Sequence, residues 1–295
     1  MAESALSEDH LDLILEKMYA TKGWDFRRYR KSSIMRCVER RLALSRLPAT
    51  DYIERLDHQP LEFNNLFNHI TIKVSEFFRD PEVFDRIEGE VLPLSLERLR
   101  SQDRNLIRVW SCGCARGEEV YSMAILLHRS NVIPAQAGIQ NAARGLDSHF
   151  RGNDGRSEGL SLKIFATDID EAAIDLARKG DYLRDSLAKI TPSILSQFFR
   201  PTDTGYQVAS FVRNLVTFGV HNMVSDIHLS HMDIILCRNL LIYFEKDLQE
   251  KVFEKLYYSL NKGGFLILGK SEVIPPLFRE QFCVIARKEK IYQKI

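Results

Sequence analysis

Two glycines and two acidic residues follow a short apolar run and could bind a positively charged ligand. Residues 107–110 have the composition of a buried strand, and Gly113 and Gly117 follow them. Glu118 and Glu119 then open a segment whose apolar spacing predicts a helix. Glycine lets a ligand approach the backbone, and carboxylates there would repel a phosphate but attract a cation. S-adenosylmethionine has two cationic groups and no phosphate, so it suits this turn; the alternative is an ordinary strand, turn and helix.

An acidic residue at the end of the next predicted strand is a second candidate ligand. The apolar stretch 162–170 has Asp168 and Asp170 near its end. In α/β cofactor domains, an acid at this position accepts hydrogen bonds from ribose hydroxyls. Either acid could instead cap the helix that follows, which Gly180 would end. Both roles can hold, with Asp168 on the ribose and Asp170 as the cap.

Polar residues also follow the apolar run 233–237. Arg238 and Asn239 stand directly after it, where open α/β sheets place the groups that contact ligands. Tyr243 comes next, before a helix that is predicted over residues 246–260. Taken alone, the run could equally be a buried strand with a polar end.

Length and composition argue against several classes of protein. The chain of 295 residues can hold one large or two smaller domains, and its net charge of +1 gives no overall attraction to nucleic acid. No apolar run approaches the roughly 18 residues that cross a bilayer, and the acidic start does not resemble a signal peptide. The five cysteines suit reduced thiols, and Cys112 and Cys114 lack a second pair at zinc-site spacing. We therefore expect a cytoplasmic protein without a metal site.

Basic residues are concentrated near the N-terminus, in a region whose apolar spacing predicts helices. Nine basic and two acidic residues lie within residues 22–46. This local charge could be a solvated helix face or a docking surface for an acidic partner. Nucleic acid is a weaker interpretation, because Tyr29 is the one aromatic residue inside the basic run proper, residues 27–46, and no nucleic-acid-binding motif accompanies it.

Two later segments depart from a simple alternation of strands and helices. Residues 131–159 hold five of the fifteen glycines and show no sustained period, which predicts an insertion in a surface loop. The alternative for this segment is a lid or a partner-binding loop. Residues 181–220 contain a predicted helix with Pro192 near its start and then a strand-like stretch.

Three segments of the chain carry a resemblance to a known family. They are RVWSCGCARGEEVYS at residues 108–122, CRNLLIYF at residues 237–244 and FFRD at residues 77–80. Each is similar to a characteristic segment of the chemotaxis receptor methyltransferases, the CheR family. Lys73 and Ser75, ahead of the third segment, replace the Asn and Thr that are usual there, which suggests a divergent member. The resemblance covers nearly the whole chain apart from the insertion.

The resemblance implies an α/β fold with a doubly wound, mostly parallel, Rossmann-like sheet, as in class I S-adenosylmethionine methyltransferases. It implies an N-terminal helical domain over residues 1–75 and the methyltransferase domain over residues 76–295. Within the second domain, it implies the loop insertion at residues 131–159 and a small antiparallel β-subdomain at residues 181–220. In the family, this subdomain can dock receptor tails.

The function that the resemblance implies is methylation of glutamyl side chains on the cytoplasmic domain of methyl-accepting chemoreceptors. The cofactor would be S-adenosylmethionine, and the glutamyl methyl esters that form would tune chemotaxis signalling. We expect no nucleic acid partner and no membrane insertion, so that any membrane contact occurs through the receptor. The alternatives are a methyltransferase of the same fold with another substrate, and a non-catalytic signalling module that binds the cofactor.

The resemblance also assigns roles to individual residues. It places Glu119 at the positive end of the cofactor and Asp168 at its ribose. It places Arg79 and Tyr243 at the reacting methyl group, where an arginine can hold the incoming carboxylate through paired hydrogen bonds. The residues expected to bind the cofactor are Lys73, Ser75, Arg79, Glu119 and Asp168, together with Asn222, Met223, Asn239 and Leu240 around the adenosine.

Overall fold

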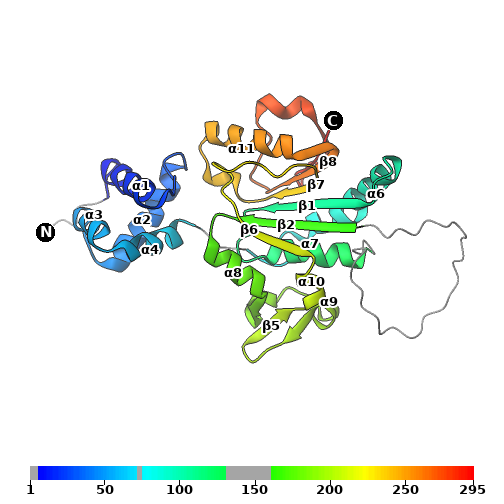
Figure 1. Ribbon diagram of the computed structural model, residues 1–295, viewed down its shortest axis with the longest axis horizontal. Coiled ribbons are helices and arrows are strands. Elements are labelled where there is room, and N and C mark those ends of the chain that lie inside the picture. The colour runs from blue at the N-terminus through cyan, green and yellow to red at the C-terminus, as the bar shows by residue number, and fades with distance from the viewer. Residues whose placement is uncertain (1–5, 72–74, 131–160) are drawn as a thin grey trace, which may run out of the picture. The chain divides into compact units, whose positions relative to one another are not determined.

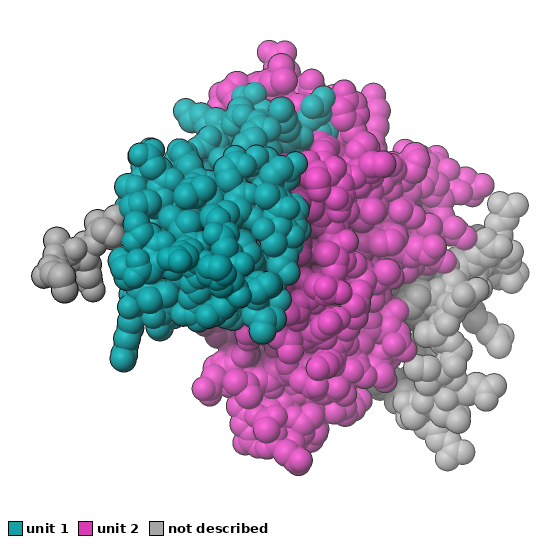
Figure 2. Space-filling model, turned by 60° about the vertical axis from the view of Figure 1, so that its left-hand side comes forward, with its two compact units in different colours: residues 1–74, 240–254 teal, residues 75–239, 255–295 magenta. Residues whose placement is uncertain are grey.

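The computed structural model describes residues 6–71, 75–130 and 161–295 (Figure 1). The chain divides into two units, which Figure 2 colours teal and magenta. Unit 1 comprises Met1–Val74 and Leu240–Glu254, and unit 2 comprises Ser75–Asn239 and Lys255–Ile295. Lys73 and the insertion predicted at residues 131–159 lie outside the described residues, and the domain boundary after residue 75 stays a prediction.

Unit 1 contains the helices that the apolar spacing predicted. They are α1 (Glu8–Lys22), α2 (Lys31–Ser45), α3 (Ala49–His58) and α4 (Pro60–Ile70). The Ser7 side chain caps α1 by accepting a hydrogen bond of 3.2 Å from the His10 N–H. The i, i+4, i+8 series of Ile34, Val38 and Leu42 is buried on one side of α2. Burial of these faces holds the helices together.

A buried carboxylate, that of Glu62, ties three of these helices together. Glu62 on α4 accepts from Arg41 Nε and Nη2 on α2 at 2.6 and 2.8 Å. It also accepts from the Tyr52 hydroxyl on α3 at 2.8 Å and from Asn65 at 3.1 Å. Burial alone would raise the pKa of Glu62, but these hydrogen bonds lower it to about 2.

The Glu62 network predicts acid sensitivity. Because the folded state lowers its pKa, the contribution of Glu62 to stability is fully present above its unfolded pKa of about 4.3 and is lost as the pH falls toward about 2. We expect Glu62→Gln to cost on the order of 3 kcal/mol at neutral pH and to flatten the loss of stability over that pH range. Urea unfolding of the full chain across this range measures both effects. The same change at the exposed Glu54 of α3 is the control, and equal pH profiles for the two variants would contradict the prediction.

Unit 2 is built on a seven-stranded sheet in the order β6-β2-β1-β7-β8-β10-β9. The strands are β1 (Leu106–Cys112), β2 (Ser161–Asp168), β6 (Val216–Val220), β7 (Met232–Cys237), β8 (Leu260–Leu268), β9 (Phe282–Ala286) and β10 (Ile291–Lys294). Pairing is parallel from β6 through β8 and antiparallel for β10 and β9. After β1 the chain builds outward through β2 and β6, and then returns to the other side of β1 with β7. This confirms the doubly wound, mostly parallel sheet, whose direction of growth reverses between β1 and β7.

Helices flank this sheet. The helix α7 (Glu118–Arg129) and the helix α8 (Glu171–Lys179) pack against β2 and β6. Outside the small β-subdomain, the other helical elements of unit 2 are α5 (Pro81–Arg86), η1 (Ile87–Val91), α6 (Leu92–Ser101) and η4 (Pro276–Gln281). The element η3 (Leu241–Tyr243) and the first nine residues of α11 (Lys246–Ser259) belong to unit 1. The observed bounds of α11 confirm the helix predicted there. No helix in the described part of the chain is long and apolar enough to span a membrane.

A three-stranded antiparallel sheet confirms the small β-subdomain (Figure 1, green). It consists of β3 (Asp181–Leu183), β4 (Phe199–Pro201) and β5 (Gly205–Val208), accompanied by η2 (Arg184–Leu187), α9 (Pro192–Phe198) and α10 (Ser210–Arg213). The range expected for it, residues 181–220, is too long. Its last five residues form β6, which pairs in parallel with β2 at the edge of the large sheet. A strand-like pattern does not reveal which sheet a strand joins, because the partner is distant in the sequence.

Candidate cofactor site

The turn between β1 and α7 is held against the end of β2. The Cys114 N–H donates to the carbonyl of Thr167 at 3.0 Å, and the Ala115 N–H donates to Asp168 Oδ2 at 2.9 Å. Gly117 has a φ of 93°, and a Cβ there would lie 3.1 Å from the Cβ of Ala177 on α8. A side chain at this position would therefore strain the turn and push it away from α8.

Arg116 is the one cation within the turn between Gly113 and Gly117. Its side chain is exposed, and its carbonyl accepts a hydrogen bond of 2.5 Å from the Tyr182 hydroxyl of β3. An exposed guanidinium is screened by water and salt. Its presence is therefore compatible with a cationic ligand at the same turn.

Asp168 lies at the carboxyl end of β2, as predicted, and uses both of its oxygens. Besides the bond from Ala115, Oδ1 accepts from the Asp170 N–H at 3.0 Å. Burial raises the pKa of Asp168, although its backbone hydrogen bonds oppose that shift. Each carboxylate oxygen retains a further lone pair, so the ribose role stays a prediction. The predicted cap is confirmed, since Asp170 Oδ1 accepts from the Ala173 N–H at 3.0 Å and α8 ends at Gly180.

A buried ion network crosses the point where the sheet reverses. The Arg238 side chain, which is 1% exposed, donates from Nη1 to Glu119 Oε2 at 3.1 Å and from Nη2 to Asp80 Oδ2 at 2.6 Å. Ser111 Oγ donates to the other Glu119 oxygen at 3.1 Å. Lys270 pairs with the other Asp80 oxygen at 2.7 Å. Burial would raise the pKa of Asp80, but Lys270 and Arg238 hold it below its ordinary value. The sequence did not identify this role for Arg238, because Asp80 and Glu119 are far from it along the chain.

Glu118 is a further candidate ligand beside the predicted Glu119. It is 5% exposed, and burial raises its pKa, while a hydrogen bond with Ser75 opposes that shift. Its Oε2 is buried and has no hydrogen-bond partner within the described residues. A buried acceptor without a partner is costly unless a ligand supplies one. The two adjacent acids therefore differ in their partners. Arg238 already neutralises Glu119, whereas Glu118 has an oxygen without a hydrogen-bond partner in the described residues.

The segment around Arg79 is fixed by its neighbours rather than by Arg79 itself. The Phe77 ring makes edge contacts with the rings of Tyr182 and Phe199, with centroids 4.8 and 5.3 Å apart. The Phe78 N–H donates to Ser122 Oγ of α7 at 2.9 Å. Arg79 is half-buried, and its side chain forms no hydrogen bond or ion pair with any residue that the structure describes. Its guanidinium is therefore available for a ligand.

Asn239 is held at the end of β7 by a carboxylate that the sequence analysis did not identify. It has a φ of 61°, and its N–H donates to Glu272 Oε2 at 3.0 Å. The same oxygen accepts from the Gly269 N–H at 2.6 Å. Glu272 lies in the loop after β8 and is buried. It thus fixes the backbone of a predicted adenosine contact.

Asn222 and Met223 form part of a tight loop after β6. Asn222 Oδ1 accepts from the Val224 N–H at 2.9 Å, which is the turn-forming role that asparagine often has. Lys255 Nζ donates to the carbonyls of Val224 and Asp226, both at 2.7 Å. Met223 is buried. Hydrogen bonds thus hold the loop in place, and the contact of Asn222 and Met223 with adenosine stays a prediction.

Unit 2 thus gathers most of the predicted residues at one edge of the sheet. Asp168, Asn222 and Asn239 follow the carboxyl ends of three parallel strands, and Glu119 begins the helix after a fourth. Carboxylates predominate there, and one of them has an oxygen without a partner in the described residues, so the edge fits a cationic cofactor. Leu240 and Tyr243 belong to unit 1, and their roles stay predictions.

The Arg238 network predicts a large loss of stability when its centre is removed. We expect Arg238→Met to cost about 3–5 kcal/mol, because two partly buried carboxylates lose their shared cation. Chemical unfolding measures this loss. The control is Arg178→Met, where the pair with Asp175 is exposed and is worth about 1 kcal/mol or less. Equal losses in the two variants would show that the network does not stabilise the fold.

Comparisons with known proteins agree with this geometry. The family model described as CheR methyltransferase, SAM binding domain, matches residues 73–150 and 151–291, and the one described as CheR methyltransferase, all-alpha domain, matches residues 9–71. The chain is 32% identical to the putative methyltransferase Cher3 of Pseudomonas putida, over the full length of both. It is 30% identical to a chemotaxis protein methyltransferase of Listeria innocua, over 76% of this chain and 74% of that protein. It is also 30% identical to an uncharacterized 104.1 kDa protein of Rhodobacter capsulatus, over 97% of this chain but 27% of that protein. The turn with Glu118 and Glu119 lies where the doubly wound sheet reverses, and the chain matches the models of both CheR domains. The chain therefore belongs to the CheR methyltransferase family, whose cofactor is S-adenosylmethionine.

Proposed function

We propose that this protein methylates glutamyl side chains on the cytoplasmic domain of a methyl-accepting chemoreceptor and so tunes chemotaxis signalling. The products would be glutamyl methyl esters and S-adenosylhomocysteine, and the protein would act in the cytoplasm. The main support for the proposal is the group of acids at the carboxyl ends of the parallel strands, Glu118, Glu119 and Asp168. They lie in a chain that matches the models of both CheR domains. Relatives at about this identity that are named chemotaxis protein methyltransferases support the choice of substrate.

The proposed reaction needs alignment more than acid–base machinery. A glutamyl side chain with a pKa of about 4.3 is ionised at neutral pH and is already a nucleophile. When bound, S-adenosylmethionine would supply a methyl group attached to a cationic sulfur. The carboxylate oxygen would bond to the methyl carbon while the carbon–sulfur bond breaks, and S-adenosylhomocysteine would be the leaving group. The residues of this chain have to align the carboxylate with the methyl group and exclude water.

We assign the positive end of the cofactor to both acids at the start of α7. Glu119 was the expected ligand, but Arg238 and Ser111 already occupy its oxygens. Glu118 has the oxygen without a partner among the described residues, so it supports a direct bond to the ammonium group. Asp168 remains the proposed ribose ligand, and Asn222, Met223, Asn239 and Leu240 remain the proposed adenosine contacts. Lys73 and Ser75 complete the proposed cofactor set.

Arg79 is proposed to hold the substrate carboxylate. Its half-buried guanidinium has no partner within the described residues, and the neighbouring Asp80 makes its ion pairs with Arg238 and Lys270. The incoming carboxylate must lose water as the site closes, and a guanidinium can replace that water in a fixed geometry. Tyr243 is the second residue proposed at the methyl group.

Substitution of Arg79 tests this role. We expect Arg79→Lys to lower kcat about tenfold or more, because a paired charged hydrogen bond worth about 1.5–3 kcal/mol becomes a point charge. Arg79→Ala should lose nearly all turnover. Calorimetry with S-adenosylhomocysteine and the unfolding midpoint serve as controls, and both should stay close to wild type. Normal turnover in Arg79→Ala would remove Arg79 from the active site.

The ion pairs of the basic segment at residues 22–46 indicate which of its charges are available to a partner. Four of its basic residues pair with acids inside unit 1, namely Arg27, Arg28, Lys31 and Arg41. Arg36 and Arg40 are exposed on α2, and neither forms an ion pair in the part of the chain that the structure describes. We propose that these two arginines contact the acidic surface of the receptor.

Charge reversal tests the docking surface. Arg36→Glu together with Arg40→Glu should raise the KM for receptor several-fold and weaken its dependence on salt, with cofactor affinity unchanged. The matched control reverses two exposed lysines, Lys251 and Lys288, for the same change in net charge. Unaltered receptor kinetics at low and high salt would leave α2 as a solvated face.

Transfer of a labelled methyl group to receptor-bearing membranes tests the function as a whole. Label that base releases as methanol indicates an ester and supports the proposal. Label that resists base indicates a methyltransferase with another kind of substrate. Tight cofactor binding without transfer indicates a signalling module.

A further inference from the structure

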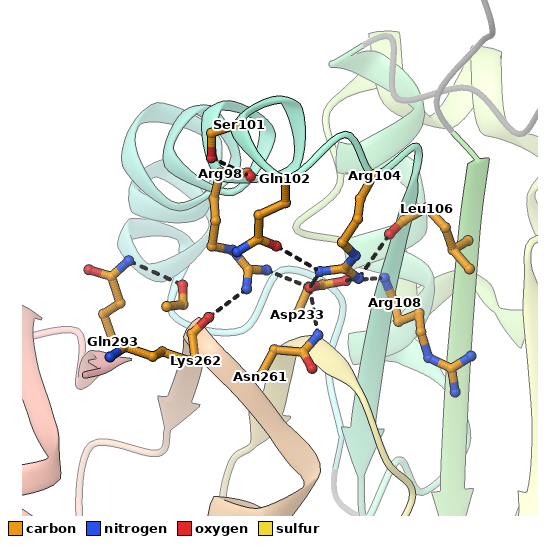
Figure 3. A network of polar contacts seen from close by, with 11 residues as sticks. Arg98, Ser101, Gln102, Arg104, Leu106, Arg108, Asp233, Asn261, Lys262 and Gln293 are labelled. Carbon is orange, nitrogen blue, oxygen red and sulfur yellow. Dashed lines mark hydrogen bonds and ion pairs between the residues drawn. The ribbon is translucent and has the colours of Figure 1, made fainter.

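A second polar site lies at the opposite edge of the large sheet, where β1, β7 and β8 begin (Figure 3). A pocket of about 490 Å³ opens there. It is lined by Arg98, Gln102, Arg104, His231, Asn261 and Lys262. Three of these side chains are cations and none is an acid. The pocket is therefore a concentration of positive charge in a chain whose net charge is only +1.

One buried carboxylate stands behind the pocket. Asp233, at the start of β7, is fully buried and accepts from Arg104 Nη1 and Nη2 at 3.0 and 3.1 Å. It also accepts from Asn261 Nδ2 at 2.9 Å and from the Arg108 N–H at 3.0 Å. Burial would raise the pKa of Asp233, but these bonds hold it below its ordinary value. Arg104, the Asn261 amide and the Arg108 N–H thus direct four donors at this one carboxylate.

Arg98 adds a second guanidinium to this single negative charge. In Figure 3 it reaches from α6 toward the same carboxylate, and it pairs with Asp233 while Nη1 donates to the Lys262 carbonyl at 2.8 Å. Its Nε is buried and has no partner within the described residues. The turn before β8 makes room for it, since Gly263 has a φ of 72° and a Cβ there would lie 2.9 Å from Arg98 Cδ. One of these two arginines is enough to neutralise Asp233 in the folded protein. The other arginine therefore leaves an excess positive charge beside the pocket.

The rim of the pocket adds donors that serve no structural contact. The side chains of Lys262 and His231 are exposed, and neither forms a hydrogen bond or ion pair with another described residue. Guanidinium and ammonium groups around one cavity match multiply charged oxyanions, above all phosphates. The volume lies within the range of small-ligand sites.

We propose that this pocket binds a small anion that carries two or more phosphate groups, such as a nucleoside diphosphate. The phosphates contact Arg98, Arg104 and Lys262, with His231 at the rim. The site is separate from the cofactor edge, because the two lie at opposite ends of the same parallel strands. Its occupation does not depend on the proposed methyl transfer.

Calorimetric titration of the full chain tests the proposal. The probes are inorganic pyrophosphate and ADP at low ionic strength, with S-adenosylhomocysteine in excess so that adenosine cannot enter the cofactor site. We expect saturable binding of one anion per chain. Lys262→Glu should weaken it about tenfold or more, as for the loss of a charged hydrogen bond. His231→Asn, which tolerates the φ of 61° at that residue, should weaken it by a smaller factor.

The control variant is Lys251→Glu, which makes the same charge change at an exposed position outside the pocket. It should bind both probes like the wild type, and all variants should keep their affinity for S-adenosylhomocysteine. Equal affinity for pyrophosphate and ADP supports recognition of the phosphates alone, whereas tighter binding of ADP supports added contacts with the nucleoside. Absence of saturable binding, or equal weakening by Lys251→Glu, overturns the proposal and leaves Arg98 and Arg104 as structural partners of Asp233.

Discussion

The buried guanidinium of Arg238 is the interaction on which the candidate site depends. It stands at the end of β7, next to the reversal of the sheet, and pairs with Glu119 of α7 and Asp80 of the segment before α5. A burial this complete would be costly for an unpaired charge, so both acids have to stay in place. One side chain thereby fixes the start of α7 and the backbone around Arg79, whose carbonyl it also contacts. Arg238 thus fixes the backbone at Arg79, whose own side chain forms no hydrogen bond or ion pair with any described residue.

The strand β7 carries an ionic cluster at each end, and the two clusters have opposite composition. At its amino end, Asp233 is surrounded by arginines, while at its carboxyl end Arg238 is surrounded by carboxylates. At the amino end two arginines share one carboxylate, whereas at the carboxyl end Lys270 also pairs with Asp80 and the further acids are Glu118 and Asp168. The carboxyl edge is therefore suited to a cation and the amino edge to an anion. This polarity is centred on Asp233, near the start of the buried strand β7, and on Arg238, directly after its end.

Unit 1 uses its charges in a different way. Its buried carboxylate, Glu62, joins helices through Arg41 and Tyr52, and other basic residues of the N-terminal segment pair with acids in the same unit. Ion pairs inside the unit thus neutralise four of the nine basic residues of the segment. Five basic residues of the segment are exposed and form no ion pair within the described residues, and two of them, Arg36 and Arg40, lie one turn apart on α2.

The sequence by itself determined the fold class, the cofactor and the place of the glycine turn. Apolar runs that end in polar residues predict parallel strands with ligands at their carboxyl ends, and these signals are local. The Asp170 cap and the Gly180 stop were predicted for the same reason, since each depends on residues within one turn of a helix. The tertiary structure alone decided how the charges are shared. Glu118 and Glu119 are neighbours of one type, and their difference arises because Arg238, more than a hundred residues away, neutralises one of them. The sequence also did not predict the hydrogen bond from Asn239 to Glu272 or the sheet that β6 joins. Both are contacts between distant parts of the chain, and such contacts produce no periodic pattern in the sequence.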